Sequence, residues 1–273
     1  MKLIVWGIVI TTLLSTWGLF ALPKRELFSR EDSYKLLKRS ILNTLKDNYL
    51  ATQNIYYPPD LYQKPHHTKK IQPNNKNTNL DLSKELYLLN LMGNNYEISI
   101  KGESTVAKRP VWVFYCKNIN YDFPRFQFWV DKEKYVILAY KAIGVHREPI
   151  ARMTTVKFYF ISNSSEVNYN RYHKIDFKSP DISKYKRPSY IPTGYVPIEL
   201  QIESNTSYLI IYSDGLDKIF VNISKKNNKN ENIESIRISK LKTTINKIVD
   251  GFDITVSGNL DKSILLNVIE SIK

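Results

Sequence analysis

Cysteine is almost missing from this chain, since Cys116 is the only one among 273 residues. A single cysteine excludes an internal disulfide, so the fold has to rest on burial of apolar side chains. Cys116 ends the apolar run Pro110–Cys116, which has the composition of a strand. We therefore expect a buried, inert thiol, with a reactive nucleophile and an intermolecular disulfide as the alternatives.

Glycine and histidine are also scarce, with nine glycines and four histidines. No glycine-rich phosphate loop and no Gly-x-Ser-x-Gly nucleophile turn occurs in the sequence. His66 and His67 are adjacent, but no further ligand follows at metal-site spacing, and His146 and His173 stand alone. The sequence thus predicts a protein that is not an enzyme and holds no metal or cofactor. A glycosidase with paired carboxylates stays open, because geometry alone identifies one.

Acidic residues are too few to balance the basic ones: 26 against 40, a net charge of +14. Such a balance favours anionic partners, namely a membrane surface, lipopolysaccharide, nucleic acid or an acidic protein domain. The plainer reading is that lysine and asparagine are abundant along the whole chain. Both readings stay open here, and export, for which the evidence follows, argues against nucleic acid.

Only one long apolar run is present, from Leu3 to Pro23. It follows Lys2 and has the form of a secretory signal with cleavage after Ala21. A run of this length also suffices to cross a bilayer, so an uncleaved membrane anchor is the main alternative and a buried core helix a minor one. We expect an exported protein, periplasmic or otherwise extracytoplasmic, whose mature chain begins at residue 22.

The first half of the mature chain reads as helices followed by strands. Ser29 is placed to cap a helix with Asp32 three residues on, and a polar stretch at 63–79 predicts a mobile loop. A second amphipathic helix is expected roughly from Leu82 to Met92, stopped by Gly93-Asn94-Asn95. Five strands separated by short turns then predict an antiparallel meander, at 96–101, 110–117, 125–130, 136–142 and 154–160.

Residues 163–197 are rich in proline and tyrosine and read as a linker. Beyond them the pattern predicts a final helix from Asp261 with an apolar face. Before that helix we expect six strands, near 198–203, 207–212, 218–223, 233–240, 243–249 and 252–257. An Asp214-Gly215 turn joins the second and third of these, and Asp-Gly between apolar runs is a strong hairpin signal.

Several short motifs, taken in order, resemble the MucB/RseB family of sigma-E factor regulatory proteins. The Gly194-Tyr195 segment leads into a strand, the hairpin 212–216 reads Tyr-Ser-Asp-Gly-Leu, and a closing strand and helix follow from Val249. In the first half, the segments 96–103, 105–113 and 128–133 resemble the middle of the family's N-terminal domain. Lys108 departs from the pattern, because a glycine usually makes that turn.

The resemblance implies an α+β fold in which an antiparallel half-barrel sheet cups helices, as in the lipoprotein carriers LolA and LolB. A smaller α+β domain follows it. The expected division is a signal peptide at 1–21, a LolA/RseB-like domain at 22–162, a linker at 163–197 and an RseB-like C-terminal domain at 198–273.

The resemblance also implies a function: binding a membrane anti-sigma factor, and sensing lipid or lipopolysaccharide, to control an envelope-stress response. The aromatic residues expected to contact a ligand are Trp112, Phe114, Phe128 and Trp129, with a filled core as the alternative. The residues expected to contact the protein partner are Tyr212, Asp214 and Leu216, with turn geometry as the alternative. Two other functions stay open, a periplasmic lipid or lipoprotein carrier and an adhesion or structural envelope protein.

Overall fold

The computed structural model describes residues 28–45, 49–56, 67–71, 82–145, 147–160, 177–204, 206–225, 234–238 and 242–272. The predicted signal peptide, residues 163–176 of the predicted linker, and His66, His146 and His173 lie outside these ranges. Within them, no helix is both long and apolar enough to cross a bilayer.

The first half of the chain forms one curved antiparallel sheet of seven strands in the order β2-β1-β7-β6-β5-β4-β3. From β3 to β7 the chain is the predicted meander, each strand pairing with the next one in sequence. The strands are β1 (Tyr49–Tyr56), β2 (His67–Ile71), β3 (Tyr96–Val106), β4 (Arg109–Asn118), β5 (Arg125–Asp131), β6 (Ile137–Ile143) and β7 (Pro149–Phe160).

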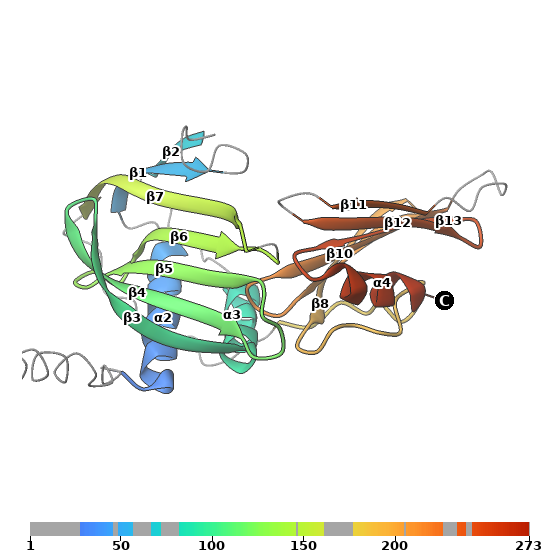
Figure 1. The fold of residues 1–273 in the computed structure, drawn as a ribbon, viewed down its shortest axis with the longest axis horizontal. Coiled ribbons are helices and arrows are strands. Elements are labelled where there is room, and N and C mark those ends of the chain that lie inside the picture. Colours follow the sequence, from blue (N-terminus) through green and yellow to red (C-terminus); the bar gives the residue numbers. More distant parts are fainter. Residues whose placement is uncertain are drawn as a thin grey trace, which may run out of the picture.

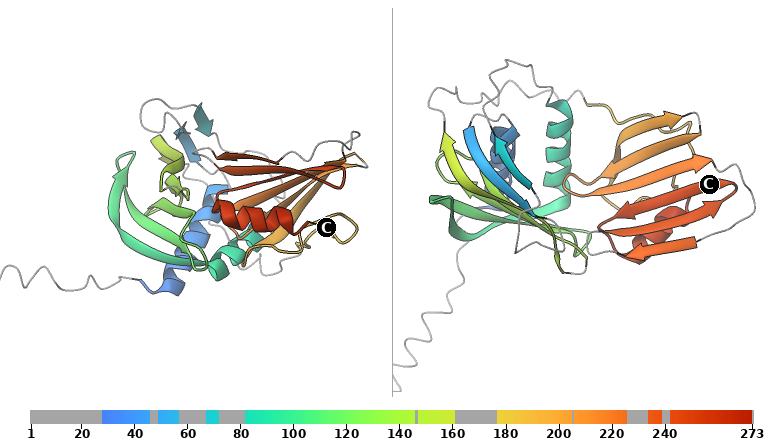
Figure 2. Two further views of the ribbon diagram at one scale, coloured as in Figure 1. Left: turned by 45° about the vertical axis from the view of Figure 1, so that its right-hand side comes forward. Right: turned by 90° about the horizontal axis from the view of Figure 1, so that it is seen from above.

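Two helices accompany this sheet, α2 (Arg30–Leu45) and α3 (Ser83–Asn95). The sheet curves around α2, and α3 stands beside it, between this sheet and the second half of the chain (Figures 1 and 2). Ser29 caps α2 as predicted, since its Oγ accepts a hydrogen bond from the Asp32 backbone N–H at 3.1 Å and donates one to the Asp32 carboxylate at 2.7 Å. We call this sheet with α2 and α3 the first lobe.

The second helix extends beyond the expected end at Met92, because α3 continues through Gly93 to Asn95, the last residue of the predicted stop segment. Gly93 serves helix packing instead of helix termination. A Cβ at this position would lie 2.8 Å from the ring of Tyr34, which projects from α2. The missing side chain therefore lets the two helices approach each other.

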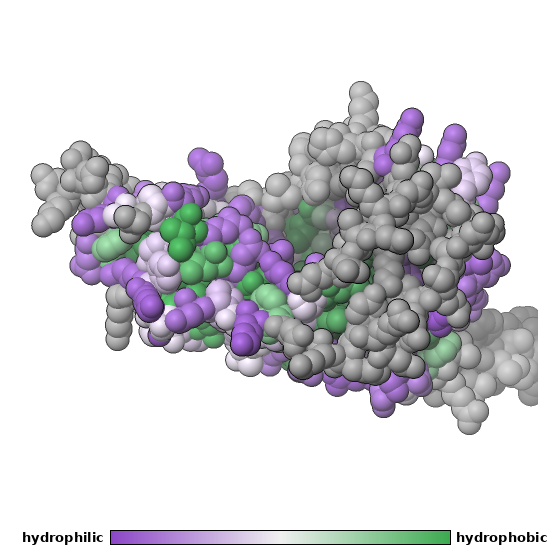
Figure 3. All heavy atoms as spheres, turned by 180° about the vertical axis from the view of Figure 1, so that it is seen from behind, coloured by the Kyte–Doolittle hydropathy of each residue, from purple (hydrophilic) through white to green (hydrophobic). Residues whose placement is uncertain are grey.

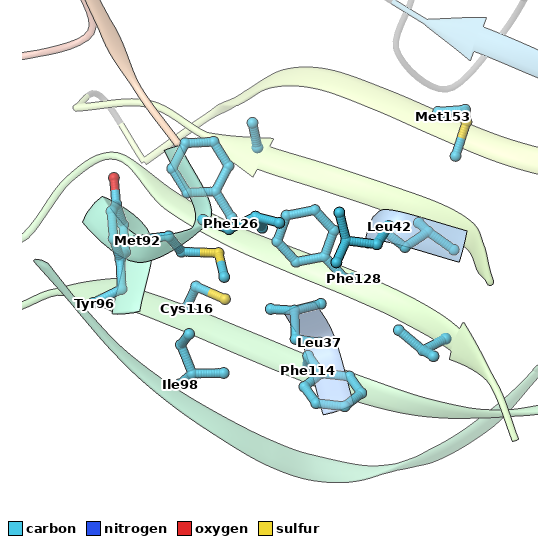
Figure 4. Packing of buried hydrophobic residues seen from close by; sticks show 14 of the residues in the cluster. Leu37, Leu42, Met92, Tyr96, Ile98, Phe114, Cys116, Phe126, Phe128 and Met153 are labelled. Atoms are coloured by element: carbon cyan, nitrogen blue, oxygen red, sulfur yellow. The ribbon is translucent and has the colours of Figure 1, made fainter. Parts of the chain in front are cut away.

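The core of the first lobe lies between the sheet and the helices. Leu37 and Leu42 of α2 pack against Phe114, Phe126 and Phe128 of the sheet (Figure 4). The predicted buried thiol is confirmed, because Cys116 is fully buried in this cluster and burial raises its pKa.

The second half of the chain forms a six-stranded antiparallel sheet in the order β11-β12-β13-β10-β9-β8, with helix α4 (Lys262–Glu270) against β12 and β13. We call this sheet with α4 the second lobe (Figure 1). Leu265, Val268 and Ile269 of α4 are buried against the sheet, as the apolar face predicts. The strands are β8 (Val196–Ser204), β9 (Ser207–Ser213), β10 (Lys218–Lys225), β11 (Glu234–Ile238), β12 (Thr243–Val249) and β13 (Phe252–Gly258).

The predicted fold class is confirmed: an α+β chain with an open, curved sheet around helices and a smaller α+β lobe after it. The expected loop at 63–79 is partly wrong, because β2 lies within it and pairs with β1. β2 is the outer strand of the sheet, and its backbone hydrogen bonds are made on one side, with β1. Such pairing does not depend on an alternating pattern of apolar side chains.

Candidate functional site at the junction of the two lobes

The tip of the β9–β10 hairpin is buried where the two lobes meet. Asp214 is fully buried and Asp217 is 4% exposed. Between them, Gly215 has φ +111°, and a Cβ there would lie 2.3 Å from the backbone nitrogen of Met92 and 2.6 Å from the carbonyl oxygen of Leu88. The hairpin tip thus rests directly on the backbone of α3, and only glycine allows that approach.

The carboxylate of Asp214 is held from both lobes at once. Its Oδ1 accepts the backbone N–H groups of Leu216 at 3.1 Å and Asp217 at 2.8 Å, within its own turn. Its Oδ2 accepts the Tyr96 hydroxyl at 2.7 Å and Nδ2 of Asn118 at 2.9 Å, both from the first lobe. Four hydrogen bonds offset the cost of burying this group, and two of them join the lobes.

Asn95, the last residue of α3, adds two more bonds across the junction. Its Nδ2 donates to the carbonyl oxygens of Gly194 at 3.0 Å and Asp214 at 2.9 Å. Gly194 has φ +89°, and a Cβ on it would lie 2.5 Å from Oδ1 of Asn95. The end of the helix therefore docks against the backbone of the second lobe in two places.

Asp217 is the second buried carboxylate, and its side-chain partners belong to the second lobe. Its Oδ2 accepts the Tyr195 hydroxyl at 2.9 Å, and its Oδ1 accepts Nδ2 of Asn259 at 2.8 Å. Its carbonyl oxygen accepts the Ser213 hydroxyl at 2.8 Å. The backbone bond from Asp217 to the Asp214 carboxylate keeps the two acids close together.

Burial perturbs the protonation of this cluster. Burial first, and the neighbouring Asp214 charge second, raise the pKa of Asp217 to about 7, while burial also raises the pKa of Asp214. Neither carboxylate forms an ion pair within the described ranges. The pKa values of Tyr96 and Tyr195 lie well above the ordinary one, through burial and then the two acidic charges. Both hydroxyls therefore remain hydrogen-bond donors at neutral pH.

At the edge of the junction the contacts are more exposed. Lys84 of α3 forms an ion pair with Glu199 of β8, each side chain about one third exposed. The ring of Tyr87 packs on that of Phe177 with centroids 4.8 Å apart. A half-exposed ion pair of this kind contributes up to about 1 kcal/mol, so the buried acids dominate the contact between the lobes.

Of the three residues predicted to contact a partner, the structure brings Asp214 and Leu216 to this junction, whereas Tyr212 lies in the core of the second lobe. Tyr212 is 2% exposed in the core of the second lobe, where burial raises its pKa to about 12. Leu216 is half-buried and packs against the core of the first lobe. All three side chains pack inside this chain, and their contact with a separate protein stays a prediction.

The four predicted ligand residues do not form one surface. Phe114, Phe128 and the half-buried Trp112 belong to the core cluster under α2, whereas Trp129 packs with Val111 in a second cluster. Neighbours in a strand point to opposite faces, which separates Phe128 from Trp129. Their contact with a lipid also stays a prediction.

Reasoning from sequence missed most of the junction: Asn95, Tyr96, Asn118, Tyr195, Asp217 and Asn259. The one local signal was a pair of acids, Asp214 and Asp217, inside an otherwise apolar hairpin. Their partners lie up to 119 positions away along the chain, so no local pattern names them. Among the described residues, no group of three or more His, Cys, Asp or Glu side chains is placed to hold a metal ion.

No protein-family model matches this sequence, and no curated protein matches it. The chain does match solved structures. A crystal structure of MucB in complex with MucA(peri) has a TM-score of 0.61 and 14% identity, covering 89% of this chain and 98% of that chain. A complex of Pseudomonas aeruginosa MucA/MucB gives 0.61 and 13%, and MucB alone gives 0.54 and 13%, with the same coverage.

At 13–14% identity the likeness concerns the fold. It extends through both lobes, because 89% of the chain is covered and neither lobe alone accounts for that share. The resemblance that the short motifs carried is therefore confirmed at the level of structure: this chain has the two-lobed fold of MucB.

Proposed function

We propose that this chain is an exported regulator, not an enzyme, that binds the extracytoplasmic part of a membrane anti-sigma factor and thereby controls an envelope-stress response. The observation that carries the proposal is the match over 89% of the chain to MucB held in a complex with MucA(peri). A shared two-lobed fold supports a shared kind of partner, although fold alone does not determine function.

The proposed domain division follows the same likeness, with a first domain at 22–162, a linker at 163–197 and a second domain at 198–273. Its support is that the described strands of one sheet lie between Tyr49 and Phe160, and those of the other between Val196 and Gly258. The buried junction joins the proposed domains through hydrogen bonds from Asn95, Tyr96 and Asn118.

The first test is recovery of the partner from the native envelope. Residues 22–273 serve as bait, and bound proteins and lipids are both read by mass spectrometry. Recovery of a single-pass membrane protein with a cytoplasmic sigma-binding domain supports the proposal. A basic exported protein of similar size is the matched control, because a strongly basic chain attracts acidic material non-specifically.

The recovered protein then allows a direct binding measurement. Its extracytoplasmic segment is titrated into the chain by calorimetry at two ionic strengths. Specific recognition predicts a saturable one-to-one complex that survives moderate salt, whereas charge attraction alone weakens steeply as salt screens it. Absence of a saturable complex, with the folded chain verified, overturns the proposal.

The carrier function receives less support from the geometry. A lipid entering the first lobe would have to displace Leu37 and Leu42 from Phe114 and Phe128, which they cover (Figure 4). We propose lipid contact at Trp112, Phe114 and Phe128 only as a secondary activity that accompanies such a displacement, and contact at Trp129 only from the opposite face of the sheet. Lipid recovered without any membrane protein would favour the carrier instead.

The surface of the second lobe on the side away from α4 carries hydrophobic residues among hydrophilic ones (Figure 3). The large apolar side chains with the most exposure in this lobe are Ile202, 58% exposed, and Tyr190, 40% exposed. Single exposed apolar residues are ordinary in soluble proteins, so they do not by themselves define the binding surface.

A further inference from the structure

Two acids buried side by side without a cation are unusual, because burial disfavours the charged form of each. Asp214 and Asp217 are in this position at the junction, where side chains of the first lobe donate hydrogen bonds to the buried Asp214 carboxylate. Most buried acids in proteins are paired with a basic residue, and no such residue bonds to either carboxylate among the described residues.

Each element packed around the two acids contributes a hydroxyl or amide hydrogen-bond donor. From the first lobe, β3 contributes the Tyr96 hydroxyl, β4 the amide of Asn118, and α3 the amide of Asn95. From the second lobe come the Tyr195 hydroxyl before β8 and the amide of Asn259 before α4.

Tyr121 also interacts with the pair, since its pKa is raised by burial and, among smaller causes, by the charge of Asp214. The groups facing the pair are all hydrogen-bond donors without a positive charge. They stabilise one negative charge well, and they have no means of neutralising a second.

The two acids respond to a second charge in different ways. Asp217 is anchored within the second lobe by Tyr195 and Asn259. Asp214 lies at the hairpin tip, and among the residues that the structure describes the side chains that bond its carboxylate, Tyr96 and Asn118, belong to the other lobe. Repulsion between two charged acids is therefore relieved most readily when Asp214 leaves the first lobe and meets water.

We propose that Asp214 and Asp217 form a pH-dependent latch between the two lobes. With one negative charge on the pair the hairpin tip stays docked on α3, and with two charges it is released. This inference concerns the free chain and does not rest on the proposed function. No covalent step is involved, only the loss of one proton to solvent.

The direction follows from the proton affinity of the folded state. An aspartate in an unfolded chain has a pKa of about 4, whereas burial raises that of Asp217 to about 7. Opening moves the charge of Asp214 away from Asp217, which stays in the second lobe, so the docked state binds the proton more tightly than the open one and docking is strongest below neutrality. As pH rises through about 7 this contribution is lost, and the junction opens.

The test measures the distance between the lobes directly. Nitroxide labels are attached at Thr105→Cys in the first lobe and Lys262→Cys in the second, two exposed positions. Cys116 is fully buried and stays unlabelled in the folded chain. Electron spin resonance on residues 22–273 should show one narrow distance distribution at pH 5.5 and a broader, longer one at pH 8.5.

Asp217→Asn mimics the protonated acid and should keep the distribution narrow at both pH values. Asp250→Asn is the matched control, the same change at an exposed acid of the same lobe, and should behave like the parent chain. A parent distribution that is the same at both pH values overturns the latch, and so does a change that persists in Asp217→Asn.

A second variant keeps the test decisive if Asp217→Asn fails to fold. Tyr195→Phe removes a donor that stabilises the charged form of Asp217. The pH midpoint of opening should therefore move upward by about 0.5–1 unit, the equivalent of one hydrogen bond. A purely structural role for Tyr195 predicts no such movement, and an unmoved midpoint contradicts the proposal. Both results are independent of whether an anti-sigma factor binds.

Discussion

At the scale of single residues, positions with a left-handed backbone conformation differ in how much stability a substitution costs. Gly215 combines φ +111° with contact to the α3 backbone, whereas Gly251 has φ +76° and a Cβ added to it would meet no atom within 4 Å. The two positions separate backbone strain from crowding, because strain is common to both and crowding occurs only at Gly215.

Gly215→Ala should lower the free energy of unfolding by roughly 2–4 kcal/mol, the sum of strain and overpacking. Gly251→Ala, with strain alone, should cost about 1 kcal/mol. Urea denaturation of both variants checks the difference. Equal losses would mean that the hairpin tip does not press on α3.

The turn between β3 and β4 departs from the pattern expected of the family, since Lys108 stands where a glycine is usual. The structure shows why this matters, because Ala107 and Lys108 both have left-handed φ values, 48° and 63°. Two-residue hairpin turns of this kind favour glycine.

Lys108→Gly should raise the free energy of unfolding by about 0.5–1 kcal/mol. The left-handed conformation costs a residue with a side chain about 1–2 kcal/mol, and the added freedom of glycine returns about 0.5–1 kcal/mol of that. Thr105→Gly, in the extended strand of the same hairpin, should instead destabilise. Thermal unfolding of the two variants measures the sign of each change in stability. A destabilised Lys108→Gly would contradict the turn geometry.

At the scale of elements, α3 serves both lobes. Its Leu86, Leu89 and Met92 are buried in the core of the first lobe, while Asn95 bonds the second lobe. The close approach of α2 to α3 depends on Gly93, against which the ring of Tyr34 packs. Tyr34 also donates its hydroxyl to the carbonyl oxygen of Leu89 at 3.2 Å.

Gly93→Ala should destabilise the parent chain, because the new Cβ collides with the ring of Tyr34. In a Tyr34→Ala background the same change should stabilise by up to about 1 kcal/mol, since alanine has the higher helix propensity. A double-mutant cycle from urea denaturation gives the coupling between the sites. Additive effects would show that the two helices do not meet there.

How far these elements could be predicted differs by type. The meander from β3 to β7 and the hairpin at Asp214-Gly215 follow from local apolar runs and short turns, which sequence displays directly. The extension of α3 past Gly93 could not be predicted, because the contact that uses this glycine comes from Tyr34 on another helix. Strand β2 was missed for a similar reason, since its partner β1 and not its own composition makes it a strand.

At the scale of the whole molecule, the junction links proton binding to stability. Burial raises the pKa of Asp217 from its ordinary value near 4 to about 7. The stability that this group contributes is fully present below pH 4 and is lost as pH rises through about 7. The exposed Lys84–Glu199 pair adds little, so salt should affect the junction less than pH does.

Asp217→Asn should therefore gain stability relative to the parent chain as pH rises. Between pH 5 and pH 7 the difference in unfolding free energy should grow by about 1.4 kcal/mol per pH unit, and flatten above pH 8. Urea denaturation of both chains across this range measures it. A difference that stays constant with pH would show that Asp217 titrates normally in the folded chain.

The sequence alone determined the class of protein: one cysteine excluded disulfides, strand and helix periodicity predicted an α+β chain, and ordered motifs indicated the MucB/RseB fold. These features are local, and local spacing suffices to specify them. Tertiary structure alone decided that the Asp214 turn is buried between two lobes and bonded by Tyr96 and Asn118. Charge, burial and proton affinity at that turn arise from residues about 100 positions apart, which only folding brings together.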